Sequence, residues 1–419
     1  MFPQLRHLVI KAAPDRNMAH EFISLLLSPT ITKLGLVDVG HWPFMDRHAV
    51  FARCTRLKHL YLEHNIDNQV VIGEPVPADF YLAFLEATNT CERLTSVCLR
   101  IRFPYRDDIV LALATCRALT ELDFSLEGDG NHIQETTVSI PRPGFTALTS
   151  LRGDQVPISL VQSIISSAYA RPMIFIEVVV PIYTHDALQG LLSTVRDHCR
   201  HDTLSALVVN GLSAAQDRES HIILQKSDLA TLAVFRRLLR VELIGLCTDL
   251  AVEPGDWDEI VEWWPKLLHM QLDVHAKPNG VFAVPIAALA PFSKRCPRLE
   301  RLFLPIDATA PPVGRDVAPA SEETRHEIVG SRPPLELLVG DAPIGNADAV
   351  AEYLLAIFPS LRDVVHDAEV VYSNVDYNLD NMEETDLESY WKRRSAWERV
   401  NGKIMVHHGA DEALLQKRM

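Results

Sequence analysis

Residues 54–65 read CTRLKHLYLEHN and contain the pattern L-x-x-L-x-L at Leu57, Leu60 and Leu62. We refer to this pattern as the leucine frame. Because successive side chains on a β-strand point to opposite faces, Leu60 and Leu62 would share one face of a short strand. The frame therefore predicts a strand whose leucines enter a core and whose intervening side chains lie on the opposite face.

The leucine frame recurs along nearly the whole chain of 419 residues. Thirteen copies, some of them degenerate, follow one another at a mean period of about 30 residues, which indicates a repeat protein. The copies are Leu5/Leu8/Ile10, Ile31/Leu34/Leu36, Leu57/Leu60/Leu62, Leu94/Val97/Leu99, Leu119/Leu122/Phe124, Leu148/Leu151, Met173/Ile176/Val178, Leu204/Leu207/Val209, Leu238/Val241/Leu243, Leu267/Met270/Leu272, Leu299/Leu302/Leu304, Leu335/Leu338 and Leu361/Val364.

Two further regularities accompany the frame. Nine copies carry Phe, Trp or Cys at a turn position three residues before the first frame residue, and in four of them Pro comes next. Pro lacks the backbone N–H that a helix needs, so a helix should stop just before the strand. The nine residues are Phe2, Cys54, Cys91, Cys116, Phe145, Phe235, Trp264, Cys296 and Phe358. The segments with apolar residues at helical spacing are 18–28, 77–90, 107–115, 159–170, 184–198, 256–264, 286–295 and 347–358.

The predicted repeat is thus a helix, a tight turn, a short strand and a return loop. One such unit cannot bury its own leucine face, but stacked copies bury it against each other. This is the leucine-rich-repeat pattern, and the period favours its long, helix-containing type. We therefore expect an α/β solenoid, a ribonuclease-inhibitor-like horseshoe, with parallel strands on the concave face and helices outside. An ordinary multidomain α/β protein would not explain why the turn residue and the frame recur together.

The sequence resembles the leucine-rich-repeat region of F-box proteins, of the fungal type in particular. The resemblance rests on the uneven repeat spacing, on the C-x-x-L-x-x-L segments that begin at Cys54, Cys116 and Cys296, and on the acidic, Trp-containing C-terminal part. It covers nearly the whole chain and implies the substrate-receptor arm of a cullin-type ubiquitin ligase. An F-box is a short helical module with a motif such as L-P-x-E-[IVL], and the turn residue Phe2 already opens the first repeat. A cullin-ligase adaptor is therefore expected as a partner only if an F-box exists upstream.

Composition and charge narrow the class of partner. The chain is 47% hydrophobic, which is ample for a core, and its formal net charge is −15. So acidic a chain is not expected to bind nucleic acid or an anionic membrane surface. No run approaches the roughly 20 apolar residues that cross a bilayer, so no membrane association is expected. The seven cysteines include no C-x-x-C pair, which favours a reducing intracellular compartment, cytoplasmic or nuclear.

Motifs for common enzyme chemistry are missing from the sequence. It has no G-x-x-x-x-G-K-[ST] or G-x-G-x-x-G loop to hold phosphate and no G-x-S-x-G nucleophile elbow. Neither of its His-Glu pairs is followed by the second His that a zinc-binding helix requires. The run HCRH at 198–201 is interpreted as the surface end of a helix rather than a metal site. We therefore expect a non-enzymatic protein without cofactor or metal.

Side chains between the frame residues are predicted to lie on the concave face. They form a mixed stripe with neither uniform charge nor a large apolar patch, which suits a protein partner. A solvated sheet face without a partner is an equally good interpretation for any single residue. The candidate partner-binding residues are His59, Tyr61, Glu63, Glu121, Asp123, Arg240, Glu242, His269, Gln271, Asp273, Arg301 and Phe303.

Two tryptophans and four cysteines receive separate predictions. Trp264 occupies the turn position and should be buried, whereas Trp263 should be partly exposed and could anchor a partner. The cysteines at the turn position should be inert, because a small apolar thiol suits a tight buried turn.

Two domains are predicted: a solenoid over 1–365, and an acidic linker with a C-terminal capping helix over 366–419. Within the second, Asp386 would cap a helix over 387–400 whose aromatic side closes the last repeat. Long connections after the strands, at 63–76, 125–144, 210–225, 273–284 and 305–334, should crowd one edge of the solenoid and mark a binding face.

Three classes of function remain open at this stage. The first is a protein-recognition solenoid, either a substrate receptor or a scaffold. The second is a standalone inhibitor or regulator, and the third is an enzyme with an unfamiliar site. The first frame has no preceding cap, so we expect either an upstream module or a partner that covers its edge.

Overall fold

The computed structural model describes residues 4–11, 26–37, 53–63, 92–100, 106–125, 139–167, 170–182, 184–211, 222–247, 249–274, 284–312, 332–340, 342–366 and 384–418. The chain forms two compact units. The first comprises Met1–Pro181 with Ser193–Thr203, and the second comprises Ile182–Leu192 with Leu204–Met419.

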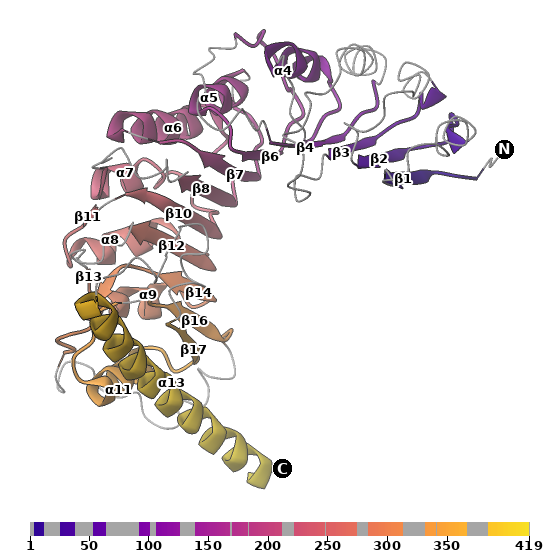
Figure 1. The fold of residues 1–419 in the computed structure, drawn as a ribbon. Helices are drawn as coiled ribbons and strands as arrows, with labels where there is room; N and C mark the ends of the chain where they lie inside the picture. The colour runs from indigo at the N-terminus through magenta and orange to yellow at the C-terminus, as the bar shows by residue number, and fades with distance from the viewer. Residues whose placement is uncertain are drawn as a thin grey trace. The chain divides into compact units, whose positions relative to one another are not determined.

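Parallel strands that pair in chain order form the sheet of the first unit (Figure 1). They are β1 (His7–Lys11), β2 (Lys33–Val37), β3 (His59–Glu63), β4 (Ser96–Arg100), β5 (Glu121–Ser125), β6 (Ser150–Asp154) and β7 (Phe175–Val180). Frame residues lie opposite frame residues, so that Leu60 pairs with Leu34 on one side and Val97 on the other.

The second unit repeats this arrangement. Its strands are β8 (Ala206–Gly211), β10 (Arg240–Cys247), β12 (His269–Val274), β14 (Arg301–Phe303), β16 (Leu335–Leu338) and β17 (Leu361–Val365). Each pairs in parallel with the next in this series. All thirteen leucine frames therefore lie in parallel strands, and the predicted α/β leucine-rich-repeat solenoid is confirmed.

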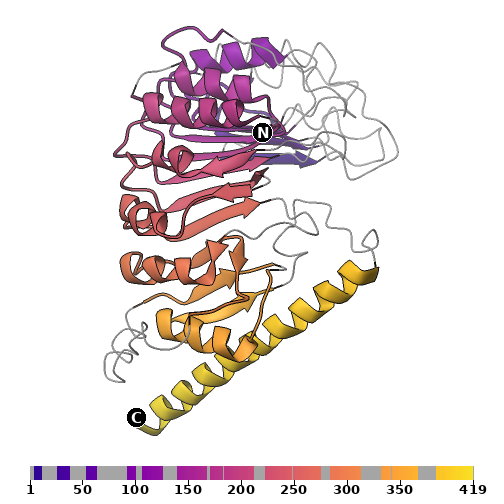
Figure 2. The ribbon, with the colours of Figure 1, turned by 90° about the vertical axis from the view of Figure 1, so that its left-hand side faces the viewer.

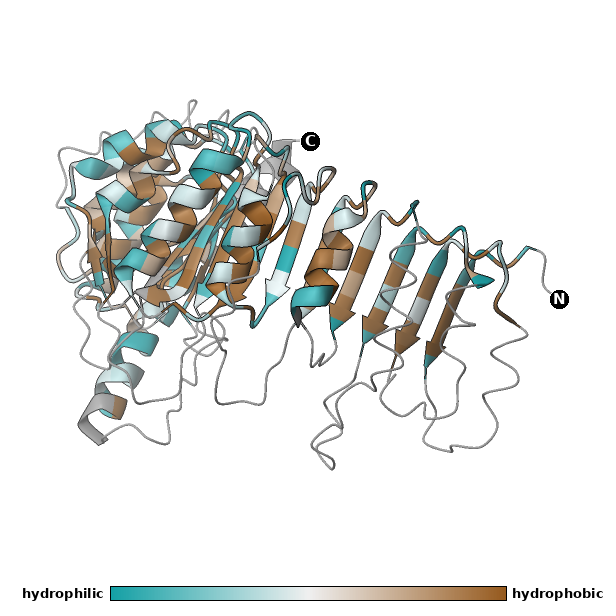
Figure 3. Ribbon diagram, turned by 90° about the horizontal axis from the view of Figure 1, so that it is seen from above, coloured by the Kyte–Doolittle hydropathy of each residue, from teal (hydrophilic) through white to brown (hydrophobic). Residues whose placement is uncertain are grey.

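The core lies on the face of the sheet to which the frame residues point. The eight frame leucines predicted to be buried are all at most 4% exposed: Leu57, Leu60, Leu62, Leu119, Leu122, Leu299, Leu302 and Leu304. The strands of the first unit are accordingly banded in hydrophobic and hydrophilic residues (Figure 3). The first frame is less protected, since Leu8 and Ile10 are half-buried on β1, which pairs with β2 alone among the described strands.

In most described repeats, one backbone carbonyl accepts two N–H groups of the next repeat. The N–H groups of Thr32 and Lys33, for example, both donate to the carbonyl of Arg6, at 2.8 and 3.1 Å. In the first unit a threonine hydroxyl often joins them. These threonines, which donate to the same carbonyl of the preceding repeat at 2.9–3.3 Å, are Thr32, Thr95, Thr120 and Thr149. This threonine ladder satisfies the polar backbone where each strand begins.

Helices line one face of the strands in each unit (Figures 1 and 2). Six of the predicted helical segments are found: α4 (Arg106–Thr115), α5 (Ile158–Ser166), α6 (His185–His198), α8 (Asp256–Trp263), η2 (Ile286–Leu289) continued by α9 (Ala290–Arg295), and α11 (Ala347–Ile357). The predicted helix at 77–90 and most of the one at 18–28 lie outside the described residues. A short helix, α7 (Lys226–Ala230), was not predicted.

Two small parallel sheets stand apart from the main strands. In one, β9 (Ile223–Gln225) pairs with β11 (Asp249–Ala251), and in the other, β13 (Val284–Pro285) pairs with β15 (Ile306–Asp307). Three of these strands fall within or at the end of connections that the sequence pattern assigned to loops. Most of the five long connections lie outside the described residues, so their crowding along one edge stays a prediction.

Every described residue at the turn position is buried, as predicted, whereas Phe2 and Cys91 lie outside the described residues. Trp264 is fully buried and its Nε1 donates to the carbonyl of Leu232 at 3.2 Å. Cys54, Cys116 and Cys296 are buried too, and burial raises the pKa of the Cys296 thiol to about 12. The prediction for Trp263 is wrong: it is buried, because its ring packs edge-on against Trp264, with 5.9 Å between ring centroids.

The C-terminal helix, α13 (Glu384–Arg418), is longer than predicted at both ends. Asp386 lies inside it and is therefore not its cap. The helix packs on α11 and β17 (Figure 2) through a buried stripe that includes Tyr390, Trp397 and Ile404. These residues recur at intervals of seven, which places them on one side of a helix.

Polar contacts fix the position of α13. The side chains of Arg399 and Lys403 each reach Asp348 on α11 at 2.8 Å. The amide oxygen of Asn401 accepts the backbone N–H of Val364 at 3.2 Å, so α13 also pairs with a polar group of β17. Within the described ranges, no helix has the length and apolar character needed to span a membrane.

Candidate protein-binding face

The face of the sheet opposite the helices carries the side chains between the frame residues, and we call it the open face. Parallel register, which has no shift between β1 and β7, arranges these side chains in rows that run across the strands. In the first unit, Tyr61 lies opposite Cys98, Cys98 opposite Asp123, and Asp123 opposite Arg152. Neighbouring strands are about 4.8 Å apart, so each row is a closely spaced series of functional groups.

The predicted residues of the first unit lie on this face. His59, Tyr61 and Glu63 belong to β3, while Glu121 and Asp123 belong to β5, with one strand between them. His59 and Glu121 are exposed and the other three are partly exposed. A partner could therefore reach all five, and whether one binds them stays a prediction.

Cross-strand pairs hold several of these side chains in place. Arg100 on β4 donates to Asp123 at 3.2 Å, and Arg152 on β6 lies 3.3 Å from Glu177 on β7. The guanidinium of Arg152 also stacks over the ring of Phe175, 4.9 Å from its centroid. Such pairs stabilise a surface only modestly, but they fix the direction in which each charge points.

Burial and neighbouring charges raise the pKa values of three side chains at the centre of this face, those of Tyr61, Cys98 and Asp154. Burial raises the pKa of the Cys98 thiol to about 12, and the negative charge of Asp123 adds to the shift. Burial also raises the pKa of Tyr61, whose hydroxyl donates to Glu63. Asp154 has a raised pKa, again because of burial, although the positive charge of Arg100 opposes the shift. The protonated thiol of Cys98 is therefore a poor nucleophile at neutral pH.

Sequence reasoning missed Arg152 and Asp154 on this face. The cause is Gly153, which occupies the third frame position of its repeat, so the frame ended at Leu151 in the sequence. A Cβ at Gly153 would come within 2.8 Å of a methyl group of Val156. Counting one more alternation beyond Leu151 would have placed both polar residues on the open face.

Ion pairs also cover the open face of the second unit. Arg240 makes a bidentate contact with Glu242, at 2.7 and 2.8 Å. Arg301 pairs with Glu336 on the next strand at 2.8 Å, and His269 lies 3.5 Å from Glu300. Arg240, His269 and Arg301 thus each have an acidic neighbour.

Three predicted binding residues of the second unit are not accessible. Glu242, Gln271 and Phe303 are buried, and Phe303 is only 1% exposed. They occupy the middle row of the face, where Glu242 is covered in part by the guanidinium of Arg240. A partner can reach Arg240, His269 and Arg301 instead. The side chain of Asp273, also predicted, lies outside the described part of the structure.

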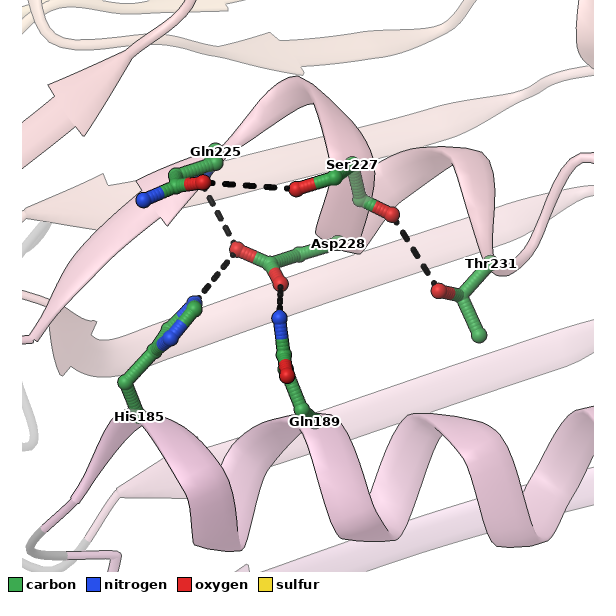
Figure 4. A network of polar contacts seen from close by, with 6 residues as sticks. All are labelled: His185, Gln189, Gln225, Ser227, Asp228 and Thr231. Carbon is green, nitrogen blue, oxygen red and sulfur yellow. Dashed lines mark hydrogen bonds and ion pairs between the residues drawn. The ribbon is translucent and has the colours of Figure 1, made fainter.

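A separate polar network lies between α6 and α7 (Figure 4). The carboxylate of Asp228, fully buried, contacts Nε2 of His185 at 2.9 Å and Nε2 of Gln189 at 3.1 Å. It also accepts the backbone N–H of Gln225 at 2.8 Å, as part of a capping box on α7. The nearby Ser227 hydroxyl bonds Gln225 rather than His185. The network therefore has the form of a structural link rather than of an activated nucleophile.

The described residues contain no cluster of side chains that could hold a metal ion, and the cysteine of the HCRH run is buried. No group of three or more His, Cys, Asp or Glu side chains there converges in a way that could hold a metal ion. Cys199, in the HCRH run, ends α6 and is buried opposite Arg171, to which its backbone is bridged. Burial raises the pKa of this thiol to about 12.

Neither a protein-family model nor a curated protein sequence matches this chain. Among solved structures, an internalin (inlF) from Listeria monocytogenes is similar to it, with 15% sequence identity and a TM-score of 0.39, over 82% of this chain and 75% of the internalin.

Proposed function

We propose that this protein is a recognition solenoid that binds another protein through the open face of its first unit. One observation carries the proposal. Exposed charges there are held at strand spacing on a rigid sheet, as in the pairs of Arg100 with Asp123 and Arg152 with Glu177. A fixed array of mixed charge suits a protein partner with complementary charge, because it gives specificity and directs association.

Exposure of its side chains favours the open face of the first unit over that of the second unit as the binding face. Its charged groups, including Arg100, Arg152 and Glu121, are exposed. The middle row of the second unit, by contrast, is buried at Glu242, Gln271 and Phe303. Binding needs side chains that lose water when the partner arrives, so the exposed rows are the better candidates.

A capture experiment with matched variants tests this proposal. The tagged full chain is used to isolate partners from cells, followed by crosslinking and mass spectrometry. The variant Arg100→Gln/Arg152→Gln removes two open-face charges. The variant Arg117→Gln/Arg142→Gln removes two exposed arginines that lie in turns off the strands.

The proposal expects the same protein to be captured by the wild type and by the turn variant but much less by the open-face variant. Crosslinks should map to β3–β7. Equal capture by both variants, with crosslinks elsewhere, would refute the proposal. Circular dichroism of each variant checks that the fold is kept.

More specifically, we propose that the chain is the substrate-receptor arm of an F-box ubiquitin ligase. The resemblance at Cys54, Cys116 and Cys296 supports it, because all three occupy the same buried turn position. The alternative is a standalone scaffold or regulatory protein. Tagging the chromosomal gene keeps whatever precedes Met1 in the cell. Co-purification of a cullin and its adaptor would favour the receptor, and stable capture of one partner without them would favour the alternative.

A further inference from the structure

Basic side chains gather where the first three strands begin. His7, Lys33 and His59 are the first residues of β1, β2 and β3 and lie directly opposite one another in register. Arg6 and Lys58 precede two of them, on either side of Thr32. All five of these basic side chains are exposed. We call Arg6, His7, Lys33, Lys58 and His59 the basic ladder.

No acidic side chain among the described residues neutralises the basic ladder. Between Gln4 and Glu63 the described residues contain one carboxylate, that of Glu63, at the far end of β3. It accepts the hydroxyl of Tyr61 instead. This differs from the rest of the open face, where Arg100, Arg152 and the arginines of the second unit have acidic partners. Among the described residues, such a group of basic side chains without an acidic partner stands out on a chain of net charge −15.

An apolar surface adjoins the ladder. Val9, in the middle of β1, is 66% exposed, and its methyl groups lie over Gly35 on β2. A Cβ at Gly35 would come within 3.2 Å of a Val9 methyl. Gly35 in turn lies opposite Tyr61 on β3. Beside the basic ladder there is therefore a row with an exposed valine, a buried glycine and a partly exposed tyrosine.

We propose that the basic ladder and Val9 dock an acidic, amphipathic helix of a partner protein, which crosses strands β1 to β3. This rests on the proposed function and names the chemistry of its partner. The geometry supports a helix: one formal cation lies at the start of each of three neighbouring strands, at Arg6, Lys33 and Lys58, and the strands are about 4.8 Å apart. Carboxylates at i and i+4 of a helix lie about 5–6 Å apart. One face of such a helix pairs with the ladder while its neighbouring apolar residues cover Val9.

The test uses two fluorescein-labelled helical peptides of about 20 residues, or five to six turns. One carries Glu at every fourth position beside a leucine stripe, and the other carries Gln in place of Glu. Binding to the full chain is measured by fluorescence anisotropy at low and physiological salt. The Glu peptide should bind more tightly than the Gln peptide, and the difference should shrink with salt because exposed charge pairs are screened.

Variants of the chain localise the binding. Lys33→Glu/Lys58→Glu should weaken binding of the Glu peptide by about tenfold or more, since like charges then face each other. Lys33→Arg/Lys58→Arg should keep it. The matched control is Lys266→Glu/Lys294→Glu, which reverses two exposed lysines of the second unit and should leave binding unchanged. A zero-length carbodiimide crosslink should join the peptide to Lys33 or Lys58 and not to Lys266.

Three outcomes overturn this inference: equal binding of both peptides, equal loss in the control variant, or crosslinks away from Lys33 and Lys58. Tighter binding of a single-stranded oligonucleotide than of the Glu peptide also overturns it, because the ladder would then recognise phosphate. If neither peptide binds the chain, but a partner is still captured and its capture depends on Arg100 and Arg152, the inference fails and the proposed function stands. If the peptides do not bind and no capture depends on Arg100 and Arg152, the proposed function fails as well.

Discussion

The indole of Trp397 on α13 donates its N–H to the backbone carbonyl of Ala342 at 2.8 Å, across 55 residues of sequence. Its ring is fully buried against the last repeats of the second unit. The contact joins a helix outside the repeat pattern to the backbone that follows β16. Terminal repeats of a solenoid need such a cover, because their outer apolar side chains have no further repeat to pack on.

Truncation of Trp397 should loosen this cover. Trp397→Ala is expected to cost about 3–5 kcal/mol, from lost burial and the cavity left behind. Trp397→Phe keeps most of the apolar surface and should cost less. Thermal unfolding measured by circular dichroism distinguishes the two. The exposed neighbour Trp391 provides the control, since Trp391→Ala should change stability little; a loss as large as that of Trp397→Ala would contradict the assignment.

Leu60 tests the core of the first unit. Leu60→Ala is expected to destabilise by about 2–5 kcal/mol, because its side chain is buried between those of neighbouring frames. Val9→Ala, on the open face of β1, should stay within about 0.5 kcal/mol of the wild type. Urea unfolding is the measurement. Equal midpoints for Leu60→Ala and Val9→Ala would show that the frame is not the core.

The carboxylate of Asp228 tests the link between α6 and α7. Asp228→Ala leaves the side chains of His185 and Gln189 and the N–H of Gln225 without their acceptor, at a cost of about 1–3 kcal/mol. Asp228→Asn retains one acceptor oxygen and should cost less. Thermal unfolding at pH 7 compares these variants. The control is Asp197→Ala, which removes a carboxylate from an exposed ion pair with Arg196. Identical behaviour of all three variants would rule out a structural role.

The thiol of Cys98 reports the charge at the centre of the open face. With a pKa of about 12, roughly one thiol in ten thousand is ionised at pH 8. Asp123→Asn removes a neighbouring negative charge, which stabilises the thiolate and lowers the pKa. Because burial is the larger cause of the shift, the pKa should remain above its ordinary value.

Alkylation by iodoacetamide measures this change, since the thiolate is the reactive form. Alkylation of Cys98 at pH 8 should be faster in Asp123→Asn than in the wild type. Glu121→Gln, in the neighbouring row of the same strand, should leave the rate as it was. An unchanged rate in Asp123→Asn would place the carboxylate too far from the thiol to matter.

Periodicity predicted the elements that repeat and missed those that do not. The frame located every main strand, including β17, whose frame is reduced to Leu361 and Val364. It did not predict α7, β9 or the other short strands, because each occurs in one connection and has no counterpart a period away. The length of α13 was underestimated for the same reason: a single helix offers no second copy to compare.

The open face shows a similar division. Alternation placed Glu121 and Arg301 on it correctly, since register follows from the frame. It could not tell that Phe303 is buried while Val9 is exposed, because both have the same place in their repeats relative to the frame. Which of them a partner can reach depends on what packs nearby, and that lies beyond local periodicity.

The sequence by itself determined the repeat, the parallel strands and the buried side of each strand. Those features follow from spacings of two or three residues along one chain segment, and the hydrophobic effect acts on each repeat alike. Only the tertiary structure decided which charges meet. The pairing of Arg100 with Asp123, and the lack of any described carboxylate beside Lys33, arise from residues on different strands. Electrostatic interactions depend on distance in space, which sequence spacing does not fix.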